Sequence, residues 1–288
     1  MSEIIITADS TCDLNKELIE KNKVKIIPLY IVYDGVSKKD GVETTPDEIY
    51  NFVTDTGNLA KTSACSMIDY KEYFEPFLND GKKIIHISLS SGLSATCNNA
   101  RLAAEELDNV YVIDSKNLST GSGHIVIEAR KLIDSGLEAN EVADKLNELT
   151  ARVDSSFILE QLQYLRKGGR CSAIAALGAN ILKLKPCIEV VDGGMEVGKK
   201  YRGNFEICLK EYIKDRLDGQ QEDIIPESIF ITRTKCDQAY VDIAREEIKK
   251  YMDFENVYET EAGSTIACHC GPSTLGILYI RKTPKQKS

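Results

Sequence analysis

The sequence lacks several features that would place it in a large class of proteins. None of its apolar runs approaches the roughly 18 residues that a membrane-spanning helix needs, so we expect no stable membrane insertion. Basic residues are not in excess: 36 Lys and Arg face 45 Asp and Glu, which leaves a net charge of −9. Because nucleic-acid-binding proteins usually present a basic face, no nucleic-acid partner is expected.

Paired cysteine motifs are missing, although the chain contains nine cysteines. Nine is an odd number, the spacing is irregular and no Cys-x-x-Cys occurs, which indicates free thiols rather than a disulfide framework. Cys268-His269-Cys270 has no matching pair elsewhere, so we interpret it as two small apolar residues around a histidine and expect no metal ion. No secretory signal precedes the first apolar segment, and these features together predict a protein of the reducing cytoplasm.

The order of apolar patterns predicts two domains. From Glu3 onward, strand patterns alternate with helical patterns, which is typical of a parallel sheet covered by helices. Beyond Asp154 the pattern changes to a hairpin around residues 192–194, followed by helices and mixed strands. We therefore predict an N-terminal parallel-sheet α/β domain at 1–154 and a C-terminal α+β domain at 155–288.

Some elements can be placed from local signals. Capping boxes mark helix starts at Thr45 and Ser66, each with an acidic residue three positions later. The other expected elements that matter below are strands at 24–33 and 157–160, helices at 137–153, 172–184 and from Ser94, and a loop at 61–66.

The most informative segment is residues 83–100, where a strand ends in a serine-rich turn and a helix follows. We call residues 88–94 the serine turn; Ser90, Ser91 and Gly92 lie within it. Hydroxyls beside the free N–H groups of a helix N-terminus favour an anion, such as a phosphate, a carboxylate or an oxyanion. In a parallel sheet this turn falls at the carboxyl edge, where ligands bind. Other polar turns expected there are 9–13 and 114–123, and the loop at 61–66, which precedes a helix, could join them.

A second interpretation of the serine turn is enzymatic. Gly92-Leu-Ser94-Ala-Thr96 nearly matches the Gly-x-Ser-x-Gly elbow of serine hydrolases, and His269 follows in the order that such enzymes use. Against a hydrolase using Ser94 and His269, the last glycine and an HGGG-type oxyanion loop are missing. Two alternatives to a nucleophilic Ser94 are that it caps the helix or that it binds an anion. Arg170 and Arg202 are either anion-binding groups or surface charges.

Six motifs stand in a recognisable order along the chain. They are Asp9-Ser-Thr-Cys-Asp-Leu14, Lys61-Thr-Ser-Ala-Cys-Ser66, Ser90-Ser-Gly-Leu-Ser-Ala-Thr96, Asp114-Ser-Lys-Asn-Leu-Ser-Thr-Gly-Ser-Gly123, Tyr164-Leu-Arg-Lys-Gly-Gly-Arg170 and His269-Cys-Gly-Pro272. Each motif alone is weak, but the ordered set is specific. Together they resemble the DegV family of bacterial fatty-acid-binding proteins, which includes the lipid-binding subunits of fatty acid kinase.

This resemblance implies a long-chain fatty acid buried in a tunnel between the two domains. It implies that Thr62, Ser94 and His269 bind the carboxylate. Ser63, Ser91, Gly92 and Arg170 are expected near the headgroup, and Arg202 is expected to dock a kinase partner. A separate ATP-dependent fatty acid kinase would phosphorylate the carboxylate to an acyl phosphate, so this chain would be a lipid-binding subunit and not an enzyme. Consistently, the chain has no Walker A motif and no kinase glycine-rich loop, and no cofactor is expected besides the fatty acid.

Two departures from the family pattern bear on the pocket. The chain reads Ala64-Cys65-Ser66 where the family usually has Gln-Pro-Ser, and Ala95-Thr96-Cys97 where it usually has Gly-Thr-Tyr. Neither removes a carboxylate ligand, but Cys97 vacates volume, so acyl length and saturation are not predicted. A binding module for another anionic lipid or for a phosphorylated metabolite remains an alternative.

Overall fold

The computed structural model describes residues 2–176 and 184–285. Within them the strands form three sheets, with the orders β2-β1-β6-β7, β10-β9-β8-β13-β11-β12 and β4-β3-β5. The strands are β1 (Ile4–Asp9), β2 (Val24–Ile27), β3 (Tyr30–Tyr33), β4 (Val36–Lys39), β5 (Lys61–Ser63), β6 (Lys83–Ser88), β7 (Val110–Asp114), β8 (Val153–Leu159), β9 (Leu184–Val191), β10 (Gly194–Arg202), β11 (Ile224–Arg233), β12 (Asn256–Glu261) and β13 (Thr274–Arg281). The helices are η1 (Ser10–Cys12), α1 (Lys16–Lys21), α2 (Pro46–Thr56), α3 (Met67–Asn79), α4 (Thr96–Glu105), α5 (Thr120–Asp134), α6 (Ala139–Thr150), α7 (Leu162–Gly168), α8 (Ser172–Ala176), α9 (Phe205–Leu217), η3 (Gln221–Asp223), α10 (Gln238–Tyr251) and α11 (Ser264–Cys270).

The four-stranded sheet is parallel throughout, as the alternation of strands and helices predicts. Its strand β1 lies between β2 and β6, with Ile6 opposite Val24 on one side and Ile85 on the other. Because the strands are parallel, the polar turns after β1, β6 and β7 meet at one edge of the sheet.

The six-stranded sheet is mixed: β11 and β12 pair in parallel, whereas its other pairs are antiparallel. Successive side chains of β8 point to opposite faces. On the outer face, Ser156 contacts Tyr212 of α9. On the inner face, Phe157 belongs to the same apolar cluster as Ile84 of β6. A parallel α/β half followed by a mixed-sheet half confirms the predicted fold class.

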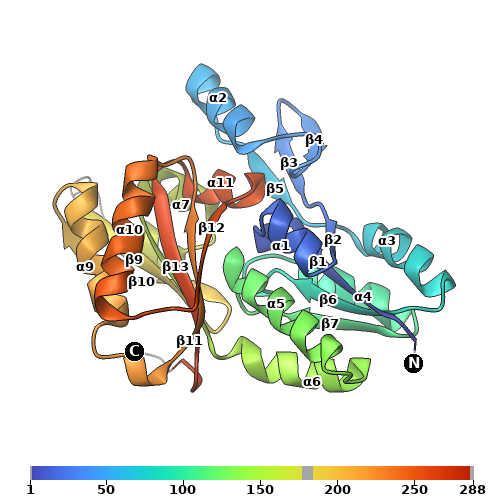
Figure 1. Ribbon diagram of the computed structural model, residues 1–288. Coiled ribbons are helices and arrows are strands. Elements are labelled where there is room, and N and C mark those ends of the chain that lie inside the picture. Colours follow the sequence, from blue (N-terminus) through green and yellow to red (C-terminus); the bar gives the residue numbers. More distant parts are fainter. Residues whose placement is uncertain (1, 177–183, 286–288) are drawn as a thin grey trace.

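Helix α5 lies between the two larger sheets (Figure 1). Its residues Ile125 and Val126 are fully buried, in one apolar cluster with Ile6 of β1 and Leu278 of β13. His124 Nε2 lies 2.9 Å from the Leu278 carbonyl oxygen, and burial lowers the pKa of His124 to about 4. The two sheets therefore share an apolar core, while the domain boundary near residue 154 stays a prediction.

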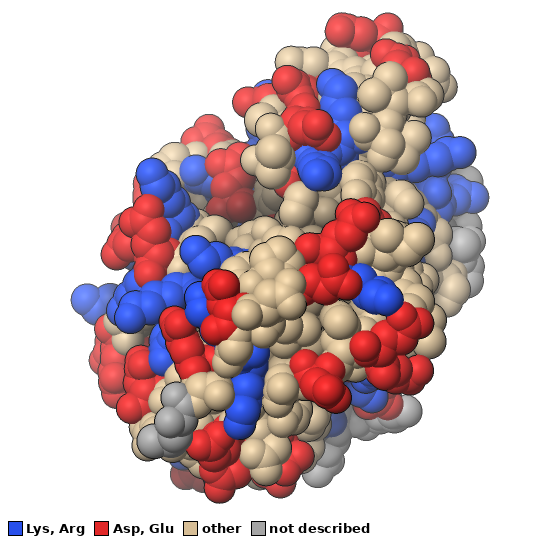
Figure 2. Space-filling view, turned by 90° about the vertical axis from the view of Figure 1, so that its right-hand side faces the viewer, with Lys and Arg blue, Asp and Glu red and all other residues tan. Residues whose placement is uncertain are grey.

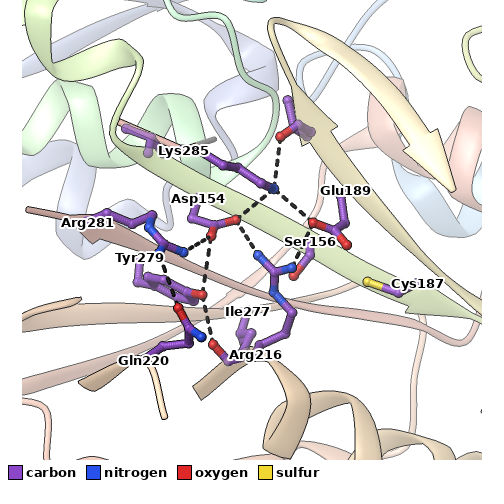
Figure 3. Close-up of polar contacts among 12 residues, drawn as sticks. Asp154, Ser156, Cys187, Glu189, Arg216, Gln220, Ile277, Tyr279, Arg281 and Lys285 are labelled. Carbon is purple, nitrogen blue, oxygen red and sulfur yellow. Dashed lines mark hydrogen bonds and ion pairs between the residues drawn. The ribbon is translucent and has the colours of Figure 1, made fainter. Parts of the chain in front are cut away.

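A buried ionic cluster lies on the outer face of the six-stranded sheet (Figure 3). The carboxylate of the fully buried Asp154 is 2.6 Å from Arg216, 3.0 Å from Lys285 and 3.1 Å from Arg281. Arg216 and Lys285 also contact Glu189. Burial by itself would raise the pKa of Asp154, but the neighbouring cations hold it below its ordinary value. The cluster ties the chain after β13 to β8 and β9.

The apolar run at 24–33, predicted as one strand, forms two strands in different sheets. Pro28 stands between β2 and β3, and proline has no N–H for a ladder hydrogen bond. Strand β3 then pairs with residues 61–63, which form β5. The prediction of one strand at 24–33 is therefore wrong, and so is the prediction of a loop at 61–66, since its first three residues form a strand of the small three-stranded sheet.

The helix predicted at 137–153 ends at Thr150, because Val153 already belongs to β8. The strand predicted at 157–160 is correspondingly longer at its start. Its first residues include Asp154, whose polarity conceals the strand in the sequence and whose charge is satisfied inside the ionic cluster.

Two other helix boundaries also differ from their predictions. The helix predicted at 172–184 is α8 in its first residues; residues 177–183 lie outside the described residues, and Leu184 is in β9. Pro186 disfavours a helical conformation of the residue before it, so this end of the predicted helix is wrong. The helix predicted from Ser94 begins two residues later, and both capping boxes are confirmed.

The surface is charged with both signs. On the face in Figure 2, acidic and basic side chains are interspersed over the visible surface. Among the described helices, none combines the length and apolar character that crossing a bilayer would require.

Candidate functional site

Two cavities lie where α11 meets the inner face of the six-stranded sheet and the carboxyl edge of the four-stranded sheet. The outer cavity has a volume of about 50 Å³ and is lined by residues of β5, the serine turn and α11. The inner cavity has a volume of about 30 Å³ and is lined by residues of β8, α11 and β13. Leu118, Ile266 and Cys270 line both cavities, so these residues form the wall between them.

Five predicted site residues meet at the outer cavity, although they come from distant parts of the chain: Thr62, Ser63, Ser94, Arg170 and His269. The cavity also has apolar lining residues: Leu29, Leu89, Leu93, Leu118, Met195 and Ile266. A few hydrogen-bonding groups within an apolar wall are typical of a small-molecule site.

Thr62 and His269 form the central polar contact of the outer cavity. Thr62 Oγ1 lies 2.9 Å from His269 Nε2. Burial, with a smaller effect from the positive charge of Arg170, lowers the pKa of His269 to about 4. The imidazole is therefore neutral at pH 7, with one nitrogen as donor and the other as acceptor. Among the described residues, Nδ1 has no hydrogen-bond partner, and a Cβ on Gly168 would overlap it.

Two buried carboxylates hold the N-terminal end of α11, which carries the site histidine. Asp13 accepts a hydrogen bond from Gly263 N at 2.9 Å, and Asp40 accepts one from Ser264 N at 2.9 Å. Asp40 also accepts the hydroxyl of Thr265 at 2.7 Å. Negative charge stabilises this end of a helix. Burial, reinforced by the charge of Asp40, raises the pKa of Asp13 to about 7.

A third buried carboxylate fixes the serine turn from inside. Asp9, at the end of β1, accepts hydrogen bonds from Ser88 Oγ at 2.7 Å and from Leu89 N at 2.8 Å. The Tyr70 hydroxyl donates to Asp9 at 2.5 Å and lies 2.7 Å from Thr96 Oγ1. Burial opposes ionisation, but nearby His86 and these hydrogen bonds hold the pKa of Asp9 below its ordinary value. The end of β6 and the start of α4 are thereby held on either side of the turn.

The tip of the β9–β10 hairpin packs against the serine turn from outside. Ser90 Oγ donates to the Gly193 carbonyl at 2.7 Å, and a Cβ on Gly92 would lie 2.6 Å from the same oxygen. Ser91 Oγ donates to Asp114 at 2.5 Å. Ser91 and Gly92 are not among the residues that line the outer cavity, and their role near a headgroup stays a prediction.

Ser94 lies at the cavity but is not paired with the histidine. Ser94 Oγ accepts a hydrogen bond from Thr96 N at 3.2 Å, but the N-cap residue of α4 is Ala95, so Ser94 precedes the helix cap and does not form it. In the described part of the chain no hydrogen bond joins Ser94 to His269, whose Nε2 contacts Thr62 instead. A nucleophilic serine needs a base within reach and a third group that orients the base. This geometry gives no support to the serine hydrolase hypothesis.

The two predicted arginines occupy different positions. Arg170 is exposed, lines the outer cavity and donates to the Gly168 carbonyl at 2.8 Å. Arg202 is exposed at the end of β10 and lines neither cavity. A docking role of Arg202 stays a prediction.

The Cys268-His269-Cys270 segment divides between the core and the cavities. Cys268 packs with Ile31 and Ile49, whereas Cys270 lines both cavities. None of the nine cysteines is in a disulfide. Over residues 2–176 and 184–285, no group of three or more His, Cys, Asp or Glu side chains is placed to hold a metal ion.

Some residues that build the site carry no signal of that role in the sequence. Asp40 stands outside every motif noted above, yet it anchors α11. Asp13 lies in a polar turn expected at the sheet edge, which is a usable signal, but its partner Gly263 is 250 residues away. Leu118 and Ile266 are indistinguishable in the sequence from ordinary core residues.

Comparisons with known proteins agree with this architecture. A family model described as "Uncharacterised protein, DegV family" matches residues 3–282. A DegV domain-containing protein of Clostridium perfringens is 32% identical over 290 residues, covering 98% of this chain and 100% of the relative.

Solved structures of similar proteins include fatty-acid-binding members. A DegV family protein from Thermus thermophilus, described by its fatty acid binding, has a TM-score of 0.86 and 28% identity, covering 97% of this chain and 99% of its own. A stearic-acid-binding protein from Eubacterium ventriosum has a TM-score of 0.81 and 27% identity, covering 98% and 99%. With its motifs, its fold and a family match over nearly its whole length, this chain belongs to the DegV family.

Proposed function

We propose that this protein binds a long-chain fatty acid, with its carboxylate at Thr62, Ser94 and His269 and its acyl chain in the two cavities. The observation that carries the proposal is the Thr62–His269 hydrogen bond, which is set among the apolar residues of the outer cavity. The fatty acid binding described for the Thermus and Eubacterium proteins supports it.

The neutral imidazole gives the headgroup contact a direction. When Nε2 carries the ring proton, His269 donates to Thr62 Oγ1, and the threonine hydroxyl directs its own proton toward the ligand carboxylate. Ser94 supplies a second hydroxyl. Both donors are neutral, so the carboxylate is oriented without a buried ion pair and its desolvation cost.

Acyl binding requires the two cavities to join. At about 50 and 30 Å³ they are far smaller than the 300–1,000 Å³ typical of ligand pockets, so Leu118 and Ile266 must move apart. Burial of a sixteen-carbon chain supplies on the order of 11 kcal/mol, at ~0.8 kcal/mol per methylene, which is available to drive this opening.

The finer proposal is that the protein presents the bound carboxylate to a partner fatty acid kinase, which forms an acyl phosphate. Arg170 supports it, because this exposed guanidinium beside the outer cavity places positive charge where a phosphorylated headgroup would emerge. Arg202, exposed at the end of β10, is the proposed docking residue.

Native mass spectrometry of the purified protein tests binding. We expect a co-purified or added fatty acid to appear as a stoichiometric adduct, and a protein that stays empty with added acid would contradict the proposal. The kinase step is tested by adding an ATP-dependent fatty acid kinase and measuring acyl phosphate. Failure with wild-type protein, or unchanged turnover with Arg202→Ala, would contradict the finer proposal. Covalent labelling of Ser94 by a fluorophosphonate would favour a hydrolase instead.

A further inference from the structure

One residue that lines the inner cavity, Ser155, has a buried hydroxyl that the fold does not use; this hydroxyl lies beside Gly121 of α5. Ser155 lies in β8 between two residues of the outer face, so its side chain is on the inner face of the sheet. It is 1% exposed and lines the inner cavity. Among the residues that the structure describes, Ser155 Oγ has no hydrogen-bond partner. Leaving a buried hydroxyl unpaired is unfavourable, so this one calls for a partner.

The other hydroxyls around the inner cavity are already engaged. Ser119 donates to Asp13 at 2.5 Å, and Thr232 is 2.5 Å from the Thr120 hydroxyl. The remaining ones are bonded as well: Thr234 to Thr274 N, and Thr274 to the Cys270 carbonyl. Ser156 also lines the cavity, but its side chain is on the outer face of the sheet, where it contacts Tyr212. Within the described chain, Ser155 is therefore the one hydroxyl of this cavity that has no partner.

Ser155 lies on the side of the cavities away from the predicted carboxylate ligands, where the distal end of an acyl chain would be. The predicted carboxylate ligands line the outer cavity, and Ser155 lines only the inner one. A chain that enters past the wall of Leu118 and Ile266 brings its distal carbons to Ser155. An unsubstituted methylene there leaves the hydroxyl unpaired, whereas an oxygen atom satisfies it.

We propose that the inner cavity recognises a polar oxygen on the distal part of an acyl chain, a hydroxyl or a keto group, by a hydrogen bond with Ser155 Oγ. The inference rests on the proposed function, because it needs the acyl chain to lie in both cavities. The preferred ligand class is then an oxygenated long-chain fatty acid. Ser155 determines this specificity: it donates to a keto oxygen, and it donates to or accepts from a hydroxyl.

A competition experiment tests the inference. Wild-type protein is mixed with equal amounts of octadecanoic acid and each member of a positional series of monohydroxyoctadecanoic acids, and the bound fractions are read by native mass spectrometry. We expect a roughly two- to tenfold preference for the isomers whose hydroxyl reaches the inner cavity, the range that one net hydrogen bond provides. Ser155→Ala is expected to abolish this preference without weakening the binding of octadecanoic acid.

The control variant is Ser63→Ala, which removes an exposed hydroxyl at the outer cavity. It acts on all acids alike, so the preference is expected to persist. Equal binding across the whole series in the wild-type protein, or a preference that survives Ser155→Ala, would overturn the inference while leaving fatty acid binding intact. Absence of binding by every acid would instead overturn the proposed function as well.

Discussion

Thr62 Oγ1 and His269 Nε2 meet at 2.9 Å across 207 residues of sequence. The contact joins β5 of the small sheet to α11, and with the hydrogen bonds of Asp40 to Ser264 and Thr265 it holds the two sides of the outer cavity together. The histidine that makes it is neutral, because burial and Arg170 lower the pKa of His269 to about 4. Above that pH the contact keeps one protonation state.

Replacing Thr62 by valine is expected to weaken fatty acid binding about tenfold or more. Valine keeps the shape of threonine but removes the hydroxyl, and a hydrogen bond to a charged group contributes about 1.5–3 kcal/mol. Displacement of a bound fluorescent fatty acid measures the effect. Thr54→Val is the matched control, since Thr54 Oγ1 donates only to the Tyr50 carbonyl within α2. Equal affinities of the two variants would remove Thr62 from the headgroup site.

Replacing Asp13 by asparagine is expected to be more favourable for stability at pH 8 than at pH 5, when the variant is compared with the wild type at each pH. Burial and Asp40 raise the pKa of Asp13 to about 7 from an ordinary value of 3.8, so the folded state favours the protonated carboxyl. That stabilisation is complete below pH 3.8 and is lost as pH rises through 7. Asparagine does not titrate, and it tolerates the backbone φ of 49° at this position.

The measurement for Asp13→Asn is the free energy of unfolding in urea at the two pH values. The difference between variant and wild type is expected to grow by on the order of 2 kcal/mol from pH 5 to pH 8. If the free energy of unfolding changed equally with pH in the variant and in the wild type, Asp13 would titrate alike in the folded and unfolded chains, contrary to the prediction.

Replacing Gly271 by alanine is expected to destabilise the fold by about 2–4 kcal/mol, more than the same change at Gly57. Both glycines have a φ of 70°, but ψ is 0° at Gly57 and 179° at Gly271. Alanine therefore carries a backbone strain of roughly 1–2 kcal/mol in the left-handed conformation of Gly57, and more in the conformation of Gly271, which almost only glycine adopts. A Cβ at Gly271 would also overlap the Tyr164 ring, whereas nothing lies within 4 Å of one at Gly57. Thermal unfolding of the pair measures the sum of this overlap and the extra backbone strain at Gly271, and equal losses would contradict the packing of Tyr164 against the end of α11.

Replacing Asp154 by asparagine is expected to cost about 3–5 kcal/mol, because it leaves the charges of Arg216 and Lys285 without their buried counterpart. Asp242→Asn removes a half-exposed ion pair with Arg245 and is expected to cost less than about 1 kcal/mol. Urea unfolding measures both. A small loss for Asp154→Asn would show that solvent already screens the ionic cluster.

Features that depend on near neighbours could be predicted from the sequence. The helix starts at Thr45 and Ser66 follow from side chains that cap N–H groups three residues away. The split at Pro28 could not be predicted in the same way, because the strand that pairs with β3 stands at 61–63. Periodicity identifies a strand, but it does not specify which sheet the strand joins.

The candidate site divides along the same line. The residues alone leave three interpretations of Ser94 open, and only the resemblance groups it with Thr62 at a carboxylate site. Asp40 could not be found, because its hydrogen bond to Ser264 N spans 224 residues and neither residue has a local pattern. Ser155 reads as a polar residue in a strand, and its missing partner becomes visible only when its neighbours are in place.

The apolar cluster around α5 has a consequence for how the chain folds. Ile125 and Val126 pack against both larger sheets at once, so neither half can complete its core while the other is unfolded. Cooperativity then extends across the whole molecule, and heat is expected to melt it in one calorimetric transition rather than two. During synthesis, the first half would expose α5 until β13, near the end of the chain, covers it.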